Sequence, residues 1–547
     1  MQCRAAAVVI SLAFLVAPAT AVARQAEHQH TGPAPQNVGT VNFDNSCAPA
    51  VKPAIGRGLA LLHSFWYEAV DREFRQVAKS DPQCAIAWWG VAMAQWQPLW
   101  EVRGPGPDAL ARGRDAIARG LALETTPRER AYLEALSKFY TDSDKVDHVQ
   151  RVVAYEEAVA QLHAQYPKDQ EGSVIYALAL LASAFANPPD KTYARQKKAG
   201  ALLQPVFRAQ PDHPGVAHYI IHAYDYPPLA AGALEAARRY ARIAPDSPHA
   251  LHMPSHIFTR LGLWDDVIAT NRQVVTAALK HQIVGEALHG ADYQVFGHLQ
   301  RGEDDLARAV IDAKPALADV PRNHTMFFAG LYATAAMPAR YAVERRAWRE
   351  AAALPEPRDF PGGRYAWADA AIYFARALGA ARTGRIDQAR HDVDRLRTLQ
   401  ATLQSEKETY WATQVDIQRR AAESWLLLAE DHPQEALELA RAAADLEDTT
   451  DKHPVTPGQI VPTRDLLGQM LLALNRPAEA LVEFEKVLKA EPNRFGPLYG
   501  AARAAELAKQ TARARDLYTL LIKVAPNSAR DAVRHARDFV AGRTLLR

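Results

Sequence analysis

The feature of this 547-residue sequence that most constrains its fold is a repeat of 34 residues near the C-terminus. Pro492 and Pro526 stand 34 positions apart, and each closes a unit in which an aromatic residue follows a small one. The two units carry Leu467, Gly468, Ala480, Phe484 and Pro492, then Ala514, Tyr518, Leu521 and Pro526. Small residues let the two helices of a unit approach closely, aromatic residues pack between units, and proline ends the second helix. A long chain can fold in this way because each unit packs mainly on its neighbours.

This spacing resembles the consensus of the tetratricopeptide repeat (TPR), and the resemblance implies an all-α, TPR-like solenoid. Such a solenoid is a right-handed superhelix of antiparallel helix pairs. Earlier units are more degenerate, but turns of the same type are visible at residues 261–266, 302–305 and 430–436, and we expect about eight to ten pairs. The least regular spans are residues 103–125, 312–365 and 447–463.

The composition is that of a soluble globular protein, and the spacing of its apolar residues favours helices. Apolar residues recur at three- and four-residue spacing, and alternating Val/Ile/Thr runs are nearly absent, which favours helices over strands. Lys and Arg number 64 against 62 Asp and Glu, so the formal net charge is only +2. This balance gives no reason to expect nucleic acid, which favours a concentrated basic face.

Residues 1–23 have the pattern of a secretory signal peptide. Arg4 precedes an apolar run over residues 5–16, and Ala21-Val22-Ala23 fits the cleavage pattern of small residues. The apolar run is too short to span a bilayer, and no other stretch is long enough. We therefore expect a periplasmic or secreted protein without a membrane span, with a disordered lead-in over residues 24–42.

Removal of the signal peptide leaves two cysteines, Cys47 and Cys84. In an oxidising compartment an even pair predicts a disulfide, worth roughly 3–4 kcal/mol in the chain-entropy account. Two buried free thiols are the alternative. The absence of C-x-x-C-H excludes covalently attached c-type haem.

Three strings resemble a group of secreted bacterial TPR proteins of undetermined function: HSFWYEA at residues 63–69, AHYIIHAYDYPP at 217–228 and HMPSHIFTRLGLW at 252–264. The resemblance runs from about residue 43 to 530 and implies fold and export without an activity. We expect a divergent TPR-like array over residues 43–446, a Pro-rich connection over 447–463, and consensus-like units over 464–547.

Histidines form the main candidate site, since nine of the 19 lie between His213 and His298. Two pairs at i,i+4 spacing place both imidazoles of a pair on one helix face, and the pairs are offset by one repeat of 34 residues. The predicted metal ligands are therefore His218, His222, His252 and His256, with His249, His289, Asp292 and Asp225 as further ligands or supporting groups. In TPR proteins these positions line the concave groove, so the resemblance implies that all four imidazoles face one channel and close on one ion.

Other interpretations of the histidines remain open at this point. Imidazoles suit zinc, copper, iron or nickel, but the same residues could bind a polar ligand or peptide, or be structural. Pro254 should kink the helix between His252 and His256 and could turn the two rings apart. H-E-x-x-H, a nucleophile elbow, a Walker loop and a dinucleotide fingerprint are all absent.

Two classes of function follow from the sequence. The first is an exported TPR scaffold whose concave groove binds a protein or peptide partner, with His63, Tyr224, Arg260 and Tyr293 as groove residues. The second is a metal-dependent enzyme or metal carrier that uses zinc or copper. The N-terminal aromatic residues, Trp66, Tyr67, Trp88, Trp89 and Trp96, are expected to be mostly buried between helices. The sequence does not indicate catalytic residues or an oligomeric state.

Overall fold

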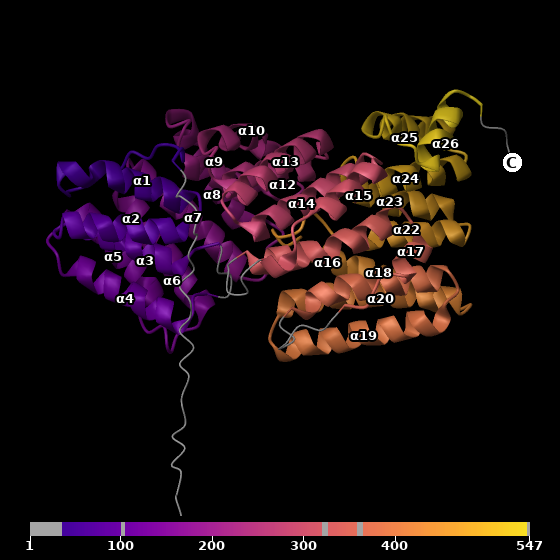
Figure 1. The fold of residues 1–547 in the computed structure, drawn as a ribbon, viewed down its shortest axis with the longest axis horizontal. Coiled ribbons are helices and arrows are strands. Elements are labelled where there is room, and N and C mark those ends of the chain that lie inside the picture. The colour runs from indigo at the N-terminus through magenta and orange to yellow at the C-terminus, as the bar shows by residue number, and fades with distance from the viewer. Residues whose placement is uncertain (1–35, 100–103, 320–325, 358–364, 544–547) are drawn as a thin grey trace, which may run out of the picture.

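The computed structural model describes residues 36–99, 104–319, 326–357 and 365–543. The predicted signal peptide lies outside these residues. Within them the chain is an all-helical repeat solenoid in which consecutive helices pack side by side (Figure 1). It contains more helices than the eight to ten pairs expected, because the irregular spans 103–125 and 312–365 also form helices. None of the helices in the described part of the chain is long and apolar enough to cross a membrane.

The helices run in three consecutive groups along the chain. The first group is α1 (Lys52–His63), α2 (Tyr67–Ser80), α3 (Ala85–Trp96), α4 (Pro107–Leu121), α5 (Pro127–Tyr140), α6 (His148–Gln165), α7 (Gln170–Ala186) and α8 (Ala194–Ala209). The second is α9 (Pro214–Tyr224), α10 (Leu234–Ile243), α11 (Pro248–His252), α12 (Pro254–Arg260), α13 (Trp264–Lys280), α14 (Val284–Gln300), α15 (Asp304–Ala313), α16 (Phe327–Glu344) and α17 (Trp348–Ala352). The third is α18 (Ala366–Arg382), α19 (Ile386–Ser405), α20 (Thr409–Ala429), α21 (Pro433–Asp448), α22 (Thr463–Ala473), α23 (Pro477–Ala490), α24 (Phe495–Leu507), α25 (Thr511–Val524) and α26 (Asp531–Val540).

Close contact between helices depends on glycines that face an aromatic ring. Phe484 of α23 lies against Gly468 of α22 and Gly500 of α24, and a Cβ at Gly500 would come within 2.5 Å of its ring. Phe74 of α2 lies in the same way between glycines of α1 and α3. The sequence prediction that this aromatic position packs between successive units is confirmed.

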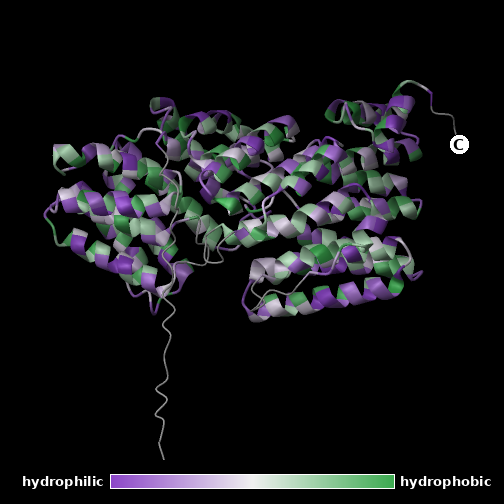
Figure 2. Ribbon diagram, in the orientation of Figure 1, coloured by the Kyte–Doolittle hydropathy of each residue, from purple (hydrophilic) through white to green (hydrophobic). Residues whose placement is uncertain are grey.

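Helices of the array are amphipathic where they face solvent. In α19 the buried residues include Ala389, Val393, Leu396 and Leu403, which recur every three, four or seven positions. The remaining face is mostly hydrophilic, as Figure 2 shows along this helix. Burial of the apolar stripe against α18 and α20 therefore holds α19 in the layer.

The C-terminal units fold back onto turns in the middle of the array. The indole Nε1 of Trp264 donates to the backbone oxygen of Asn493 at 2.8 Å, and the backbone N–H of Phe495 donates to Gln300 Oε1 at 3.0 Å. Arg530 forms an ion pair with Asp304. These contacts join residues 195 and 229 positions apart and hold the C-terminal units against the middle of the array.

The Pro-rich segment between α21 and α22 packs against helices from the middle of the chain. Lys452 Nζ lies 3.0 Å from Asp225 Oδ2, the Tyr293 hydroxyl donates to the backbone oxygen of Thr456 at 3.2 Å, and Arg340 donates to that of Gln459 at 2.7 Å. These partners belong to the end of α9 and to α14 and α16. The segment therefore occupies the inner face of the array at these helices.

Part of the expected disordered lead-in is ordered. Residues 36–42 lie outside the helices, with Val38 and Val41 buried, and the backbone N–H of Thr40 donates to the backbone oxygen of Asp212 at 3.2 Å. Polar composition hid this docking, because only the two valines are buried and most of the other residues stay exposed. A disulfide between Cys47 and Cys84 then joins this N-terminal segment to the start of α3.

Candidate metal centre

Six histidines from four helices form two groups of three. One group is His218 and His222 of α9 with His249 of α11, and the other is His252 of α11 and His256 of α12 with His289 of α14. Within each group the candidate ligand nitrogens all lie within 4.8 Å of one another. We call them cluster 1 and cluster 2.

This division corrects the prediction that His218, His222, His252 and His256 converge on one ion. Each i,i+4 pair stays together on its own helix face, as the spacing predicts. Packed helix axes are about 8–10 Å apart, so the third imidazole comes from the nearest residue of the next helix rather than from the next pair. His249 completes cluster 1 in this way, and His289 completes cluster 2.

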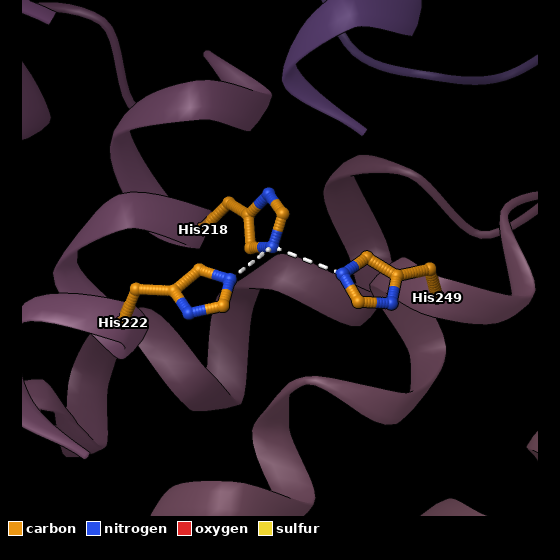
Figure 3. Close-up of side chains that lie close together, drawn as sticks. All are labelled: His218, His222 and His249. Carbon is orange, nitrogen blue, oxygen red and sulfur yellow. Dashed lines mark hydrogen bonds between the residues drawn. The ribbon is translucent and has the colours of Figure 1, made fainter. Parts of the chain in front are cut away.

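Cluster 1 brings its three Nε2 atoms together (Figure 3). The Nε2 atom of His218 lies 3.1 Å from that of His222 and 3.2 Å from that of His249. Three nitrogens bound to one tetrahedral ion at 2.0–2.1 Å would be about 3.3–3.4 Å apart. Small movements of the rings would therefore admit an ion.

The tautomer of His218 is fixed by the backbone of α1. Its Nδ1 lies 2.7 Å from the backbone oxygen of His63, and a carbonyl can only accept a hydrogen bond. The hydrogen is therefore on Nδ1, and Nε2 carries the lone pair that faces the other two rings. Such a hydrogen bond on the far nitrogen is the usual support for a metal-binding imidazole.

In cluster 2 the hydrogen bonds fix the tautomers of two rings, His252 and His256, and their lone pairs face each other. His252 Nδ1 lies 2.9 Å from Asn271 Oδ1, and His256 Nδ1 lies 2.9 Å from Asp225 Oδ2. The Asn271 amide nitrogen donates to the backbone oxygen of Val267, which leaves its oxygen as the acceptor for His252. Both Nδ1 atoms are therefore donors, and neutral rings carry lone pairs on both Nε2 atoms, which are 3.1 Å apart. A cation between them removes this repulsion.

Asp225 is kept ionised by two buried cations. Its Oδ1 accepts from Arg260 Nε at 2.8 Å, and its Oδ2 lies 3.0 Å from Lys452 Nζ. Burial alone would raise the pKa of Asp225, but Lys452 and Arg260 lower it well below its usual range. The carboxylate therefore accepts the hydrogen bond from His256 at neutral pH.

The six imidazoles are neutral at pH 7, which is the form that binds metals. Burial is the main cause, and it lowers the pKa of each ring; the pKa falls further because a proton on one ring would repel a proton on its neighbours, and Lys452 adds to this for His222, His256 and His289. The pKa of His222 and that of His289 fall to about 3. The pKa values of His218, His249 and His252 fall well below the usual range. The Nδ1 atom of His289 is buried and has no hydrogen-bond partner among the described residues.

One aromatic ring contacts all three imidazoles of each cluster. The Phe65 ring centre lies 4.4, 5.7 and 5.4 Å from those of His218, His222 and His249. Tyr293 lies 4.7, 5.7 and 5.2 Å from the rings of cluster 2. These rings hold the imidazoles in place and limit the access of water.

Other predicted residues have different roles. Asp292 is fully buried beside Arg340 and belongs to neither cluster, because the guanidinium, 3.5 Å away, is its partner. Tyr224 packs against Gly200 of α8 and Gly232, so its contacts are with the helical core. Arg260 binds Asp225, and Pro254 divides the helix into α11 and α12 without separating the rings of His252 and His256.

His63 belongs to a third group, with Glu171 and His213, that is fully hydrogen-bonded. Glu171 accepts from His63 Nε2 at 2.8 Å and from His213 Nε2 at 3.0 Å. The remaining nitrogens contact the Tyr219 hydroxyl and the backbone N–H of Val216. We infer that this group is structural, because its hydrogen bonds join α1 to the helices behind cluster 1.

Sequence reasoning missed Asn271, Lys452 and Phe65. Asn271 is a fully buried polar residue within an amphipathic helix, which is the one signal that could have indicated it. Lys452 lies in a segment whose composition suggests a linker. Trp66, Tyr67, Trp89 and Trp96 are buried as expected, whereas Trp88 is only partly buried.

Comparisons with known proteins add little to this description. No protein-family model matches the chain, and no curated protein matches it in sequence. Among solved structures, "Structure of Naa15/Naa10 bound to HypK-THB" is similar at 12% identity and a TM-score of 0.24, over 90% of this chain and 73% of that one. At that TM-score the likeness carries no weight. The fold therefore rests on the helices themselves and the candidate function on the two clusters.

Proposed function

We propose that this protein binds two transition-metal ions, one in each tri-histidine cluster. The observation that supports this best is the pair of Nε2 lone pairs in cluster 2, which face each other at 3.1 Å in a buried, neutral environment. A proton could relieve the repulsion only on a ring whose pKa lies below neutrality. A metal ion relieves it at neutral pH and uses both lone pairs.

Zinc and copper fit the donor set best. Both accept neutral imidazole nitrogens, and three ligands with one open position are typical of zinc sites that bind water or substrate. Copper binds such sites more tightly than zinc. The sites therefore suit a metal-dependent enzyme better than a purely structural role, in which all positions are filled by protein.

X-ray absorption at the metal edge tests this proposal directly. Protein prepared without a histidine tag and loaded with Zn²⁺ should show three nitrogen neighbours per ion at about 2.0–2.1 Å. His252→Ala should remove only the ion of cluster 2, and His281→Ala is the matched control, since His281 belongs to neither cluster. Oxygen-only coordination would contradict the proposal.

Export also remains part of the proposal. It is supported by the signal-peptide pattern of residues 1–23 and by the disulfide between Cys47 and Cys84, since disulfides persist in oxidising compartments. N-terminal sequencing of the mature protein should begin close to Arg24. Membership of the TPR family rests on the repeat pattern alone.

The scaffold alternative loses support at the centre of the array. Residues 452–461 already lie against α14 and α16, so a partner peptide would have to displace this segment. Partner binding at other surfaces stays a prediction.

A further inference from the structure

A pocket lies directly beside cluster 1. Six of its eleven lining residues are apolar or aromatic, among them Phe65, Trp66, Ile283 and Met326, and the other five are polar or charged and include His249, Glu286 and Glu68. Because His249 both lines the pocket and belongs to cluster 1, a molecule in the pocket would be adjacent to the first ion. Mostly apolar pockets with a few convergent polar groups are typical of small-molecule sites.

Glu286 is the group that points to a ligand. It is only 3% exposed, and its Oε1 has no hydrogen-bond partner among the residues that the structure describes. Leaving such an oxygen unsatisfied is costly, and native proteins rarely do so without a functional reason. Burial raises the pKa of Glu286 to about 8, so the carboxyl is largely neutral at pH 7 and can donate or accept a hydrogen bond.

Phe65 both lines the pocket and contacts the three imidazoles of cluster 1. Its backbone has a φ of 57°, in the left-handed region that bulky residues rarely adopt. Conformations of this kind cost about 1–3 kcal/mol and gather at functional sites. The turn between α1 and α2 thus holds a ring that contacts cluster 1 and also lines the pocket.

We propose that this pocket binds a small, flat, mostly apolar molecule with one hydroxyl group, of the phenol class. The ring lies among Phe65, Trp66 and Met326, and the hydroxyl forms a hydrogen bond with Glu286. Its place as the substrate site of the metal centre rests on the proposed function, but binding itself does not require the ion.

Calorimetric titration of metal-free protein with phenol, and with toluene as the analogue that lacks the hydroxyl, tests this inference. Phenol should bind saturably and more tightly than toluene. Glu286→Leu should weaken phenol by about 5- to 10-fold, the loss of one buried hydrogen bond, and leave toluene unchanged or tighter. Glu286→Gln should retain most of the phenol affinity, because the amide still donates and accepts.

Folding of the Leu variant is not at risk, since it replaces an unpartnered buried carboxyl by an apolar group. Absence of saturable phenol binding, or equal phenol affinity in wild type and Glu286→Leu, would overturn the inference. Phenol binding without any metal binding would overturn the proposed function and leave the pocket standing. In copper-loaded protein, phenol should shift the Cu²⁺ electron paramagnetic resonance signal of cluster 1. An unchanged signal would contradict the claim that the pocket is the substrate site of the metal centre.

Discussion

Replacement of Asn271 by leucine should weaken metal binding in cluster 2 while leaving the metal-free fold nearly intact. Asn271 Oδ1 holds the hydrogen of His252 on Nδ1 and so directs the Nε2 lone pair at the ion. Loss of a group that orients a metal-binding imidazole typically reduces affinity 10- to 100-fold. This corresponds to about 1.4–2.7 kcal/mol of binding free energy.

The metal-free protein should respond differently. Without Asn271, the hydrogen of His252 can move to Nε2 and donate to His256 Nε2 at 3.1 Å, which replaces the lost hydrogen bond and ends the repulsion. The free energy of unfolding should therefore change by less than about 1 kcal/mol. Asn187→Leu is the control, because its amide likewise donates to a carbonyl four residues earlier but lies outside both clusters.

Chelator competition gives the affinity of each site, and urea unfolding gives the stability without metal. Asn271→Leu should lower the affinity of one site only, and cluster 1 should keep its ion. Two sites with wild-type affinity in this variant would refute the reasoning about tautomers.

Three further predictions concern other parts of the molecule. Cys47→Ser, which leaves Cys84 unpaired, should lower the free energy of unfolding by roughly 3–4 kcal/mol. Intact-mass analysis of the unreduced wild type should find no alkylatable thiols, and two such thiols would rule the disulfide out. Burial lowers the pKa of His289 to about 3, from a value near 6.5 in the unfolded chain, so the free energy of unfolding of the metal-free protein should be highest above pH 6.5 and should decline towards pH 3. His289→Gln should make this decline shallower in urea unfolding measured over the same pH range. A decline as steep as that of the wild type would contradict the prediction. Asp225→Asn should lower the free energy of unfolding by about 3–5 kcal/mol and expose residues 452–461 to proteolysis. The control Asp451→Asn, at a more exposed ion pair, should lower it by less than about 1 kcal/mol. Equal losses of stability in the two variants would be inconsistent with the docking of residues 452–461 on the centre of the array.

The repeat could be predicted from sequence because its causes are local. Phe484 and the glycines that face it lie on adjacent helices, so their spacing in the chain encodes their contact. The same holds for His218 with His222 and for His252 with His256, whose four-residue spacing places each pair on one face.

The completed site could not be predicted because it depends on contacts between distant residues. Asn271 approaches His252 from α13, which follows α12, and Lys452 reaches Asp225 from 227 positions away. That second contact exists only because the C-terminal units fold back and carry the Pro-rich segment across the inner face. Composition described this segment as a linker, and nothing in its own residues shows where it docks.

The number of metal ions per chain tests the central claim most directly. Protein made without an affinity tag, loaded with Zn²⁺ and dialysed, should contain two ions per chain by elemental analysis. His218→Ala and His252→Ala should each retain one ion, and the double variant should retain none while its helical circular dichroism is unchanged, because the repeat core does not depend on these rings. Absence of stoichiometric metal in the wild type, or two ions in the double variant, would contradict the account.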